Sequence, residues 1–177
     1  MRIDPALLAV NFLFLPKGRD KFRQQLTSAS LRKLRLHLMR KRTKARELAL
    51  QILYQIDIMQ DNFSVSLDNF WQGQAQEIDA GVKQFASELV KGTQEHRQII
   101  DQKISQYAKN WELKRMAVVD RNILRQACFE LLYRPDIPPK VTINEAIDLA
   151  KRFSGLEAGK FVNGILDKIR ADIGKEN

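Results

Sequence analysis

The apolar residues of this chain recur at helical spacing from Thr43 to the C-terminus, and this periodicity restricts the fold more than any other feature of the sequence. In the first such stretch, over about residues 44–59, Leu48, Ile52 and Ile56 lie four residues apart. This spacing places apolar side chains on one face of a helix. No segment shows the strict alternation of polar and apolar residues that is typical of a half-buried strand. The sequence therefore predicts an all-α fold.

Further helices are predicted by the same pattern and by residues that start or stop helices. They are expected around residues 67–71, 82–90, 99–107, 118–133, 143–153 and 161–169. The stretch 118–133 is apolar over enough of its circumference to be the central buried helix. Gly92 is a natural stop for the third helix, and Thr142 with Glu145 forms a reciprocal capping pair that predicts a helix start at Ile143. With 177 residues and 44% apolar content, the chain can bury one sizeable core, or two small ones in a single compact unit.

The positive charge of the chain is concentrated in its first 46 residues. This segment holds 13 Lys and Arg against 2 Asp and Glu, whereas residues 47–177 hold 17 against 19. The densest run is the basic arm, residues 40–46, which contains Arg40, Lys41, Arg42, Lys44 and Arg46. Clustered cations gain affinity for a polyphosphate by releasing its condensed counterions. The arm therefore predicts a nucleic-acid partner, and Arg42 and Arg46 are expected to share one helical face.

Other interpretations of the basic arm remain open. A disordered and solvated tail, or a targeting run, would carry the same charge. An acidic membrane surface would also attract the arm, but Leu48, Ile52 and Leu53 on the helix that follows are expected to pack in a protein core. No apolar stretch approaches the roughly 20 residues needed to span a bilayer. An integral membrane protein is therefore not expected.

Residues 1–38 form a separate segment in the predicted organisation, and residues 39–177 form the helical domain. An apolar patch, residues 7–15, is followed by Pro16 and a basic, polar stretch. A secretory signal is disfavoured because no small-residue cleavage site follows the patch, whereas the Arg-rich, acid-poor composition suits an organelle transit peptide. A start codon assigned too early is favoured, since Met39 stands directly before the basic arm. If it is translated, the segment is predicted to be disordered.

Common catalytic and metal-binding motifs are absent from the sequence. It has no glycine-rich phosphate loop, no paired-cysteine metal motif and no His-Glu-x-x-His helix, and its histidines are His37 and His96. The single cysteine, Cys128, excludes an internal disulfide and suits a reducing cytoplasm. We therefore expect neither enzymatic activity nor a cofactor. Folding could still pair helix carboxylates into an acid site, and the candidates are Asp101, Asp120, Glu130 and Glu145.

A second set of candidate ligand-binding residues lies nearer the C-terminus. Lys160 and Phe161 follow Gly159 at an expected helix start, where free backbone amides and the lysine could hold phosphate while the ring accepts a base. Phe161 could equally be a core residue. Tyr107, at the end of a predicted helix, has the same two interpretations: it stacks on a base or it caps the core.

Four stretches of the sequence resemble the NusB family of bacterial transcription antitermination factors in their order and spacing. They are residues 42–54 (RTKARELALQILY), 119–125 (VDRNILR), 137–147 (IPPKVTINEAI) and 159–166 (GKFVNGIL). The resemblance covers about residues 40–173, and the closing stretch is its most specific part. Residues 1–38 have no counterpart in the family.

The resemblance implies an all-helical fold of two sub-bundles and an RNA-binding protein without enzymatic activity. Its implied partners are single-stranded boxA RNA, the small-subunit ribosomal protein NusE, and RNA polymerase with other Nus factors, in a complex that suppresses termination in ribosomal RNA operons. The implied RNA-binding residues are Arg40, Lys41, Arg42, Lys44, Arg46, Tyr107, Glu157, Lys160 and Phe161. The implied NusE-binding residues are Tyr54 and Asp120.

Two alternative functions fit the same residues. A general assembly module would bind a ribosomal protein and tolerate any RNA, without preference for boxA. An organelle-targeted homologue is suggested by residues 1–38 alone. The first alternative differs from an antitermination factor in one measurable respect, which is sequence preference for boxA.

Overall fold

The described part of the chain comprises residues 28–60, 62–74, 77–109 and 111–176 in the computed structural model. The chain divides into two units, Met1–Met39 and Arg40–Asn177, and the second unit carries all of the candidate site residues. The disordered extension and the targeting peptide predicted for the N-terminal segment fall mainly on residues 1–27, which lie outside the described residues.

Helices dominate the described part of the chain, in which no strand occurs. In chain order they are α3 (Ser28–Met59), α4 (Phe63–Gln72), α5 (Ala80–Glu95), α6 (Arg97–Tyr107), a short 3₁₀ turn η1 (Leu113–Arg115), α7 (Val118–Tyr133), α8 (Pro139–Phe153) and α9 (Leu156–Glu176). The all-α prediction is confirmed. The apolar periodicity has the expected physical effect, since each long helix of the second unit buries the face that its spacing marked out.

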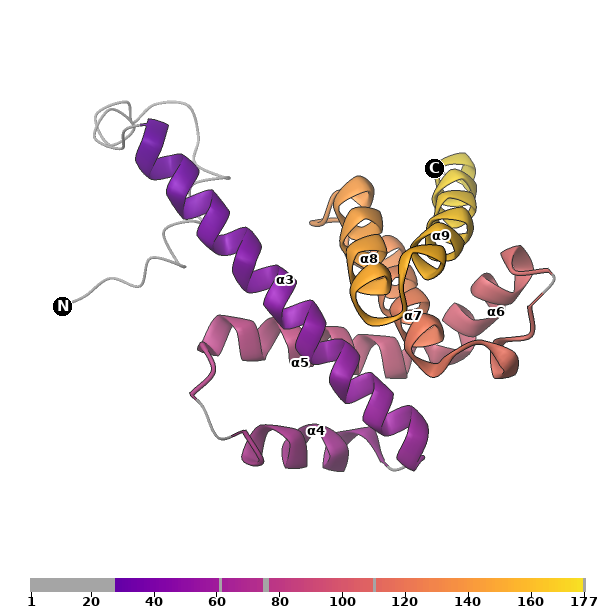
Figure 1. Ribbon diagram of the computed structural model, residues 1–177, viewed down its shortest axis with the longest axis horizontal. Coiled ribbons are helices and arrows are strands. Elements are labelled where there is room, and N and C mark those ends of the chain that lie inside the picture. Colours follow the sequence, from indigo (N-terminus) through magenta and orange to yellow (C-terminus); the bar gives the residue numbers. More distant parts are fainter. Residues whose placement is uncertain (1–27, 61, 75–76, 110, 177) are drawn as a thin grey trace. The chain divides into compact units, whose positions relative to one another are not determined.

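Helix α7 is the central element of the second unit. It packs against α5, α6, α8 and α9 (Figure 1). Nine consecutive residues, from Asn122 to Glu130, are buried, so neighbours surround the helix on every side. Burial also raises the pKa of the Cys128 thiol to about 12, and the thiol therefore stays protonated at neutral pH.

The helices of the second unit form two sub-bundles, as the resemblance implies. In the first, α4 packs on α5, and the Arg42 guanidinium of α3 lies 5.2 Å from the centre of the Phe85 ring of α5. In the second, α6, α7, α8 and α9 pack on one another, with α8 and α9 side by side (Figure 1). Contacts between α5 and α7 join the two sub-bundles.

Helix α3 begins earlier than the periodicity suggests. The sequence predicts a start near Lys44, whereas the helix already runs from Ser28. Residues 28–43 are rich in Leu, Arg and Lys and contain neither Gly nor Pro. These residue types have high intrinsic helix propensity, so the helix extends beyond its predicted start. The basic arm is consequently an internal part of a long helix.

The predicted capping pair at the start of α8 is wrong. The helix begins at Pro139, with Pro138 as its N-cap, rather than at Ile143. Proline suits the first helical position because its fixed φ matches the helix and its missing N–H has no partner to lose there. Thr142 lies inside the helix, where its hydroxyl donates a 3.0 Å hydrogen bond to Glu130 of α7.

The predicted stop at Gly92 is also wrong, because α5 continues to Glu95. Gly92 is buried, and a Cβ built on it would lie 2.0 Å from Cζ of Phe129 in α7. The glycine therefore serves close packing between two helices instead of helix termination. Its intrinsic disadvantage within a helix is offset by the room it leaves for the phenyl ring.

Candidate nucleic-acid interface

The cations of the basic arm lie on α3, and most of them are accessible to solvent. Arg40 and Lys44 are exposed, and Lys44 Nζ lies 3.6 Å from Oε2 of Glu47. Lys41 Nζ donates a 2.7 Å hydrogen bond to Oδ2 of Asp79, which holds the pKa of that carboxyl below its usual value. An ion pair between accessible groups, such as Lys41 and Asp79, contributes only about 0–1 kcal/mol, so a phosphate can replace Asp79 at low cost. Glu47 is buried and also pairs with Arg152, whereas Lys44 itself remains exposed to an incoming phosphate.

Arg42 is exposed and lies above an aromatic ring. Its guanidinium is within 3.8 Å of Asp136 and stacks over Phe85 of α5. Arg134, from the end of α7, lies over the same ring at 5.3 Å. The hydrogen bond to Asp136 is the main reason why the pKa of Arg134 is raised, so its guanidinium stays charged beside the arm. The ring thus orients two guanidinium groups at the exposed surface.

Arg46 differs from the other cations of the arm because it lies in the protein interior. Its side chain is 3% exposed, and its Nε and Nη2 atoms each donate a 2.8 Å hydrogen bond to Glu130 of α7. Glu145 of α8 lies 3.5 Å from Nη1. Burial opposes the charged form of Arg46. The hydrogen bonds that Arg46 donates to Glu130, together with the negative charges of Glu130 and Glu145, outweigh this effect and raise the pKa of Arg46. The prediction that Arg46 meets an anionic ligand is corrected: it joins α3 to α7 and α8.

The C-terminal candidates lie in the first two turns of α9, which begins at Leu156, so the predicted helix start at Gly159 is wrong. The backbone N–H of Gly159 already donates to the carbonyl of Gly155 and is therefore not free to bind phosphate. Lys160 and Glu157 are exposed and form an ion pair of 2.7 Å with each other. Phe161 is half-buried against the core, and its ring meets the indole of Trp111 edge to face at 5.6 Å. Among the described residues, no hydrogen bond or ion pair joins this group to the basic arm. The structure therefore leaves Lys160 exposed and Phe161 half-buried at adjacent positions of α9, and within the described ranges neither is joined to the arm by a hydrogen bond or ion pair.

Tyr107 ends α6 and is partly buried against the core. The chain then turns, and the backbone N–H of Trp111 donates a 2.8 Å hydrogen bond to the carbonyl of Ala108. This hydrogen bond ties the backbone of Trp111 to the end of α6. Tyr107 itself keeps both predicted roles, since it is neither fully buried nor fully exposed.

The candidate partner surface lies at the other end of α3. Tyr54 is 41% exposed, and one turn further along the helix Ile58 is also exposed. Asp120 lies in the first turn of α7 and is half-buried. Its Oδ1 atom is buried and has no hydrogen-bond partner among the described residues. The exposed aromatic and aliphatic side chains form the kind of surface that protein partners cover.

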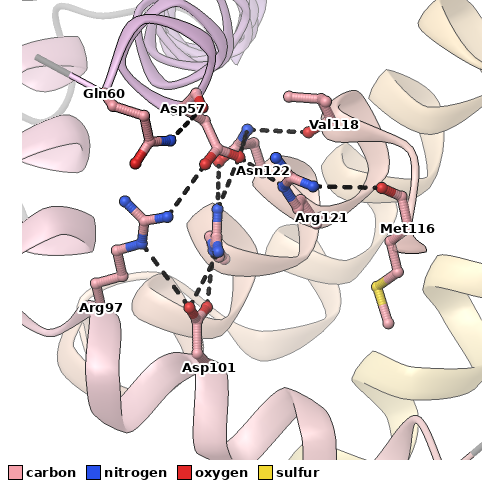
Figure 2. A network of polar contacts seen from close by, with 9 residues as sticks. Asp57, Gln60, Arg97, Asp101, Met116, Val118, Arg121 and Asn122 are labelled. Carbon is pink, nitrogen blue, oxygen red and sulfur yellow. Dashed lines mark hydrogen bonds and ion pairs between the residues drawn. The ribbon is translucent and has the colours of Figure 1, made fainter. Parts of the chain in front are cut away.

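A network of ion pairs fixes this end of α3 to α6 and α7. Figure 2 shows Asp57 of α3 directed toward Arg97, Arg121 and Asn122. Asp57 is buried and accepts hydrogen bonds of 2.6 Å from Arg121 and 2.9 Å from Arg125. Burial opposes ionisation of Asp57, but the hydrogen bond from Arg121 and the charge of Arg125 outweigh it, so the pKa of this carboxyl is lowered. The network lines one wall of an open pocket of about 810 Å³.

Three of the four carboxylates considered for an acid site are engaged in ion pairs, and Asp120 is the exception within the described part of the chain. Asp101 lies 2.7 Å from Nε of Arg125, while Glu130 and Glu145 both face Arg46. Among the described residues, no group of three or more His, Cys, Asp or Glu side chains could hold a metal ion. Likewise, none of their helices is both long and apolar enough to cross a membrane. The candidate contact surfaces of the described residues are therefore the cations of the basic arm and the aromatic side chains near the start of α9.

A family model described as the NusB family matches residues 43–171, which is most of the chain. The chain belongs to the NusB family. The curated NusB transcription antitermination protein of Geotalea uraniireducens is 50% identical over 137 residues, spanning 74% of this chain and 94% of that protein. The corresponding protein of Myxococcus xanthus is 45% identical over 136 residues, spanning 76% and 97%. The resemblance drawn from four sequence stretches is confirmed.

Solved NusB structures share the fold. A structure of T. maritima NusB is 39% identical and superposes with a TM-score of 0.67, covering 73% of this chain and 90% of that chain. A crystal structure of the antitermination factors NusB and NusE in complex with dsRNA is 29% identical, with a TM-score of 0.68, covering 76% and 98%. The NusB match begins inside the basic arm, so Arg40, Lys41 and Arg42 precede it.

One exposed residue of this NusB domain was missed by sequence reasoning. Trp111 lies in the short segment between α6 and η1, and no periodic pattern marks it. The available signal was a large aromatic residue between predicted helices, close to Lys109 and Arg115. Its contact with Phe161 joins residues fifty positions apart and becomes visible only in the folded chain.

Proposed function

We propose that this protein is a transcription antitermination factor that binds boxA-type single-stranded RNA together with NusE. The observation that carries the proposal is the exposed cationic surface of the basic arm in a chain of the NusB family. Curated relatives are named transcription antitermination protein, and one solved relative contains NusB, NusE and dsRNA. In this proposal the protein acts by binding alone, in the cytoplasm, within an RNA polymerase complex that includes other Nus factors.

The RNA backbone is held by the accessible cations of the arm, which are Arg40, Lys41, Arg42 and Lys44. Phosphate oxygens replace the accessible carboxylate of Asp79 at Lys41 and add to the contacts of the exposed Lys44, and the released counterions supply the favourable entropy. Because Arg42 is oriented by the Phe85 ring, its guanidinium is the best placed for a directed hydrogen bond to phosphate. Arg46 supports the site indirectly by fixing α3 to α7.

The RNA bases are bound near the start of α9. Lys160 exchanges its exposed ion pair with Glu157 for a contact with a phosphate oxygen. The freed carboxylate then accepts a hydrogen bond from the amino group of a base. Phe161 and Tyr107 stack on splayed bases, which is the usual way in which proteins hold single-stranded RNA. The two contact areas, arm and α9, together require a strand of several nucleotides.

NusE binds at Tyr54 and Asp120. Tyr54 supplies an exposed aromatic anchor of the type enriched at protein interfaces, and Ile58 extends the apolar surface beside it. Asp120 gives this surface a negative charge that suits a basic ribosomal protein. The Asp57 network supports the geometry, because it holds the helix that carries Tyr54 against the helix that carries Asp120.

The proposal is tested by titrating fluorescently labelled boxA RNA with the full chain, with and without NusE, at two salt concentrations. The controls are a scrambled RNA of the same composition and the boxA sequence annealed to its complement. We expect the single-stranded boxA RNA to bind most tightly, NusE to strengthen that binding, and salt to weaken it. The comparison with annealed RNA distinguishes recognition of a single strand from simple attraction to a polyanion.

Equal affinity for boxA and scrambled RNA, with no effect of NusE, would contradict the proposal. A response to NusE without preference for boxA would favour the alternative, a general assembly module for RNA and ribosomal protein. A preference for the annealed duplex would place the recognition in A-form geometry rather than in splayed bases.

A further inference from the structure

We propose that Trp111, Lys109, Glu112 and Arg115 form a binding subsite for one nucleotide of single-stranded RNA, adjacent to Phe161. This inference rests on the proposed RNA-binding function and extends it to a segment that has no assigned role, the turn between α6 and η1. The ligand class is a nucleotide with an unpaired base, which stacks on the indole while its phosphate meets the flanking cations.

The indole of Trp111 is unusually accessible for its size. It is 55% exposed, although a tryptophan normally buries most of its large apolar surface. Its contact with Phe161 is edge to face, with centroids 5.6 Å apart and an interplanar angle of 65°, so Phe161 does not cover it by parallel stacking. An exposed aromatic face that a second ring supports from the side is suited to accept a flat base.

The backbone holds this indole in place. The N–H of Trp111 donates to the carbonyl of Ala108 at 2.8 Å, and the N–H of Arg115 donates to the carbonyl of Glu112 at 2.8 Å. These two turns enclose the segment that carries the proposed subsite. The hydrogen bonds of Trp111 and Arg115 reduce the conformational entropy that these two residues lose when a base stacks.

The polar side chains around Trp111 supply the remaining contacts of a nucleotide. Lys109, Glu112 and Arg115 line, with Trp111, a hollow of about 400 Å³, which is within the usual range of small-ligand sites. Neither Lys109 nor Arg115 has a carboxylate partner within 4.0 Å among the described residues. Lys109 and Arg115 can therefore bind the phosphate of a nucleotide whose base stacks on the aromatic face of Trp111.

Glu112 argues for a selective subsite. A carboxylate repels phosphate, so a purely electrostatic patch would not include Glu112. A carboxylate does, however, accept hydrogen bonds from the amino groups of bases. Cytosine, adenine and guanine carry such a group, whereas uracil offers a carboxylate only its ring N3–H donor. The subsite therefore discriminates among bases by the position of their donor groups, and this adds sequence preference to the backbone contacts of the arm.

The decisive experiment compares boxA RNA binding by the full chain and by its Trp111→Ala and Trp111→Phe variants. Loss of one stacked base corresponds to about a 5- to 150-fold weaker affinity, which we expect for Trp111→Ala. Trp111→Phe keeps an aromatic face and should retain most of the affinity. A Lys109→Ala, Arg115→Ala double variant should bind more weakly and with a smaller salt dependence.

Tryptophan fluorescence gives a direct readout of stacking. The chain contains two tryptophans, so the Trp71→Phe variant leaves Trp111 as the sole indole. We expect boxA RNA to quench this emission, and Trp71→Phe to bind boxA like the unmodified chain. This readout remains informative even where Trp111→Ala disturbs the fold, since it needs no change at position 111.

Unchanged boxA affinity of Trp111→Ala, or unquenched emission on saturation with RNA, overturns the subsite. Weaker NusE binding with unchanged RNA binding would also overturn it, because the indole would then belong to a protein interface. The proposed function is judged separately, by boxA against scrambled RNA in the unmodified chain. If the unmodified chain prefers boxA but Trp111→Ala binds boxA with unchanged affinity, the proposed function stands and only the subsite is contradicted.

Discussion

At the scale of single residues, neighbouring cations of the basic arm have opposite environments. Arg42 is exposed above Phe85, whereas Arg46, one helical turn further along, is buried against Glu130. In sequence the two are equivalent members of one basic run, and both also lie within 6 Å of the same phenyl ring. The partner carboxylate on α7 decides the difference, because it makes burial of one guanidinium tolerable.

Replacing Arg46 should be far more destabilising than replacing a surface cation. Arg46→Ala leaves the buried carboxylate of Glu130 uncompensated, which costs about 3–5 kcal/mol of unfolding free energy. Lys44→Ala, at an exposed position, should change it by less than about 0.5 kcal/mol. Urea denaturation of both variants measures the contrast. The double variant Arg46→Met, Glu130→Leu should recover most of the loss, and no recovery would argue against the buried pair as the cause.

The Asp57 network predicts a loss of stability in acid. The folded-state pKa of Asp57 is lowered, while the unfolded value is about 3.9, so the unfolded chain binds the proton more readily. The stabilisation is therefore complete above about pH 4 and is lost as pH falls through the folded pKa. Urea midpoints between pH 7 and pH 2 should follow this course. The deficit of Asp57→Asn relative to the unmodified chain should shrink at low pH.

A suitable control for this experiment is Asp148→Asn, which alters an exposed carboxylate with no ion pair among the described residues. Its stability difference from the unmodified chain should stay nearly constant with pH. If the stability deficit of Asp57→Asn were also constant with pH, the ionised carboxylate of Asp57 would contribute no specific stabilisation.

At the scale of helices, local propensity and tertiary packing compete. In α3, Leu, Arg and Lys extend the helix beyond its predicted start, and their high propensity accounts for this extension. In α5 the balance is reversed, since Gly92 lies within the helix despite its poor propensity. In α8 proline at the first position sets the helix start, and Thr142 is thereby released to bind Glu130.

Gly92→Ala tests which of these effects dominates in α5. Propensity alone would favour alanine by about 1 kcal/mol. The new Cβ would, however, meet the Phe129 ring at 2.0 Å, and such overpacking typically costs about 1–3 kcal/mol. We expect a net destabilisation in thermal or urea unfolding. Gly164→Ala in α9 is the matched control, because no atom lies within 4 Å of its added Cβ, and it should stabilise the protein.

At the scale of the whole molecule, the net charge of +9 is unevenly distributed along the chain. The body of the protein is close to neutral and uses its charges in ion pairs such as those of Asp57 and Glu130. The excess positive charge lies in the first 46 residues, and the basic arm contributes five of its cations. A molecule of this kind attracts a polyanion through one region and leaves the remaining surface free for protein partners.

The salt dependence of RNA binding should reflect this distribution. Four accessible arm cations that each contact one phosphate correspond to a slope of about −3 in log affinity against log salt. Arg42→Ala should reduce the magnitude of the slope by about 0.7, whereas Lys91→Ala, an exposed lysine on α5, should leave it unchanged. Fluorescence titrations of boxA RNA at four salt concentrations provide the slopes. Equal slopes for both variants would count against the arm as the phosphate-binding surface.

Much of the fold and part of the candidate site could be predicted from the sequence. Helix class, the central position of α7 and the cationic character of the arm depend on the order of neighbouring residues, and these were predicted correctly. The burial of Arg46 and the contact of Trp111 with Phe161 were not. Both involve residues that are distant in sequence, Glu130 and Phe161, and no local pattern encodes such contacts.

The sequence by itself therefore determined which segments are helical and where the positive charge lies, because periodicity and charge are properties of consecutive residues. Only the tertiary structure decided which cations remain available to a ligand, which glycine admits a neighbouring ring and which aromatic side chains meet. The physical reason is that burial, ion pairing and close packing are set by contacts between helices, and those contacts exist only after the chain has folded.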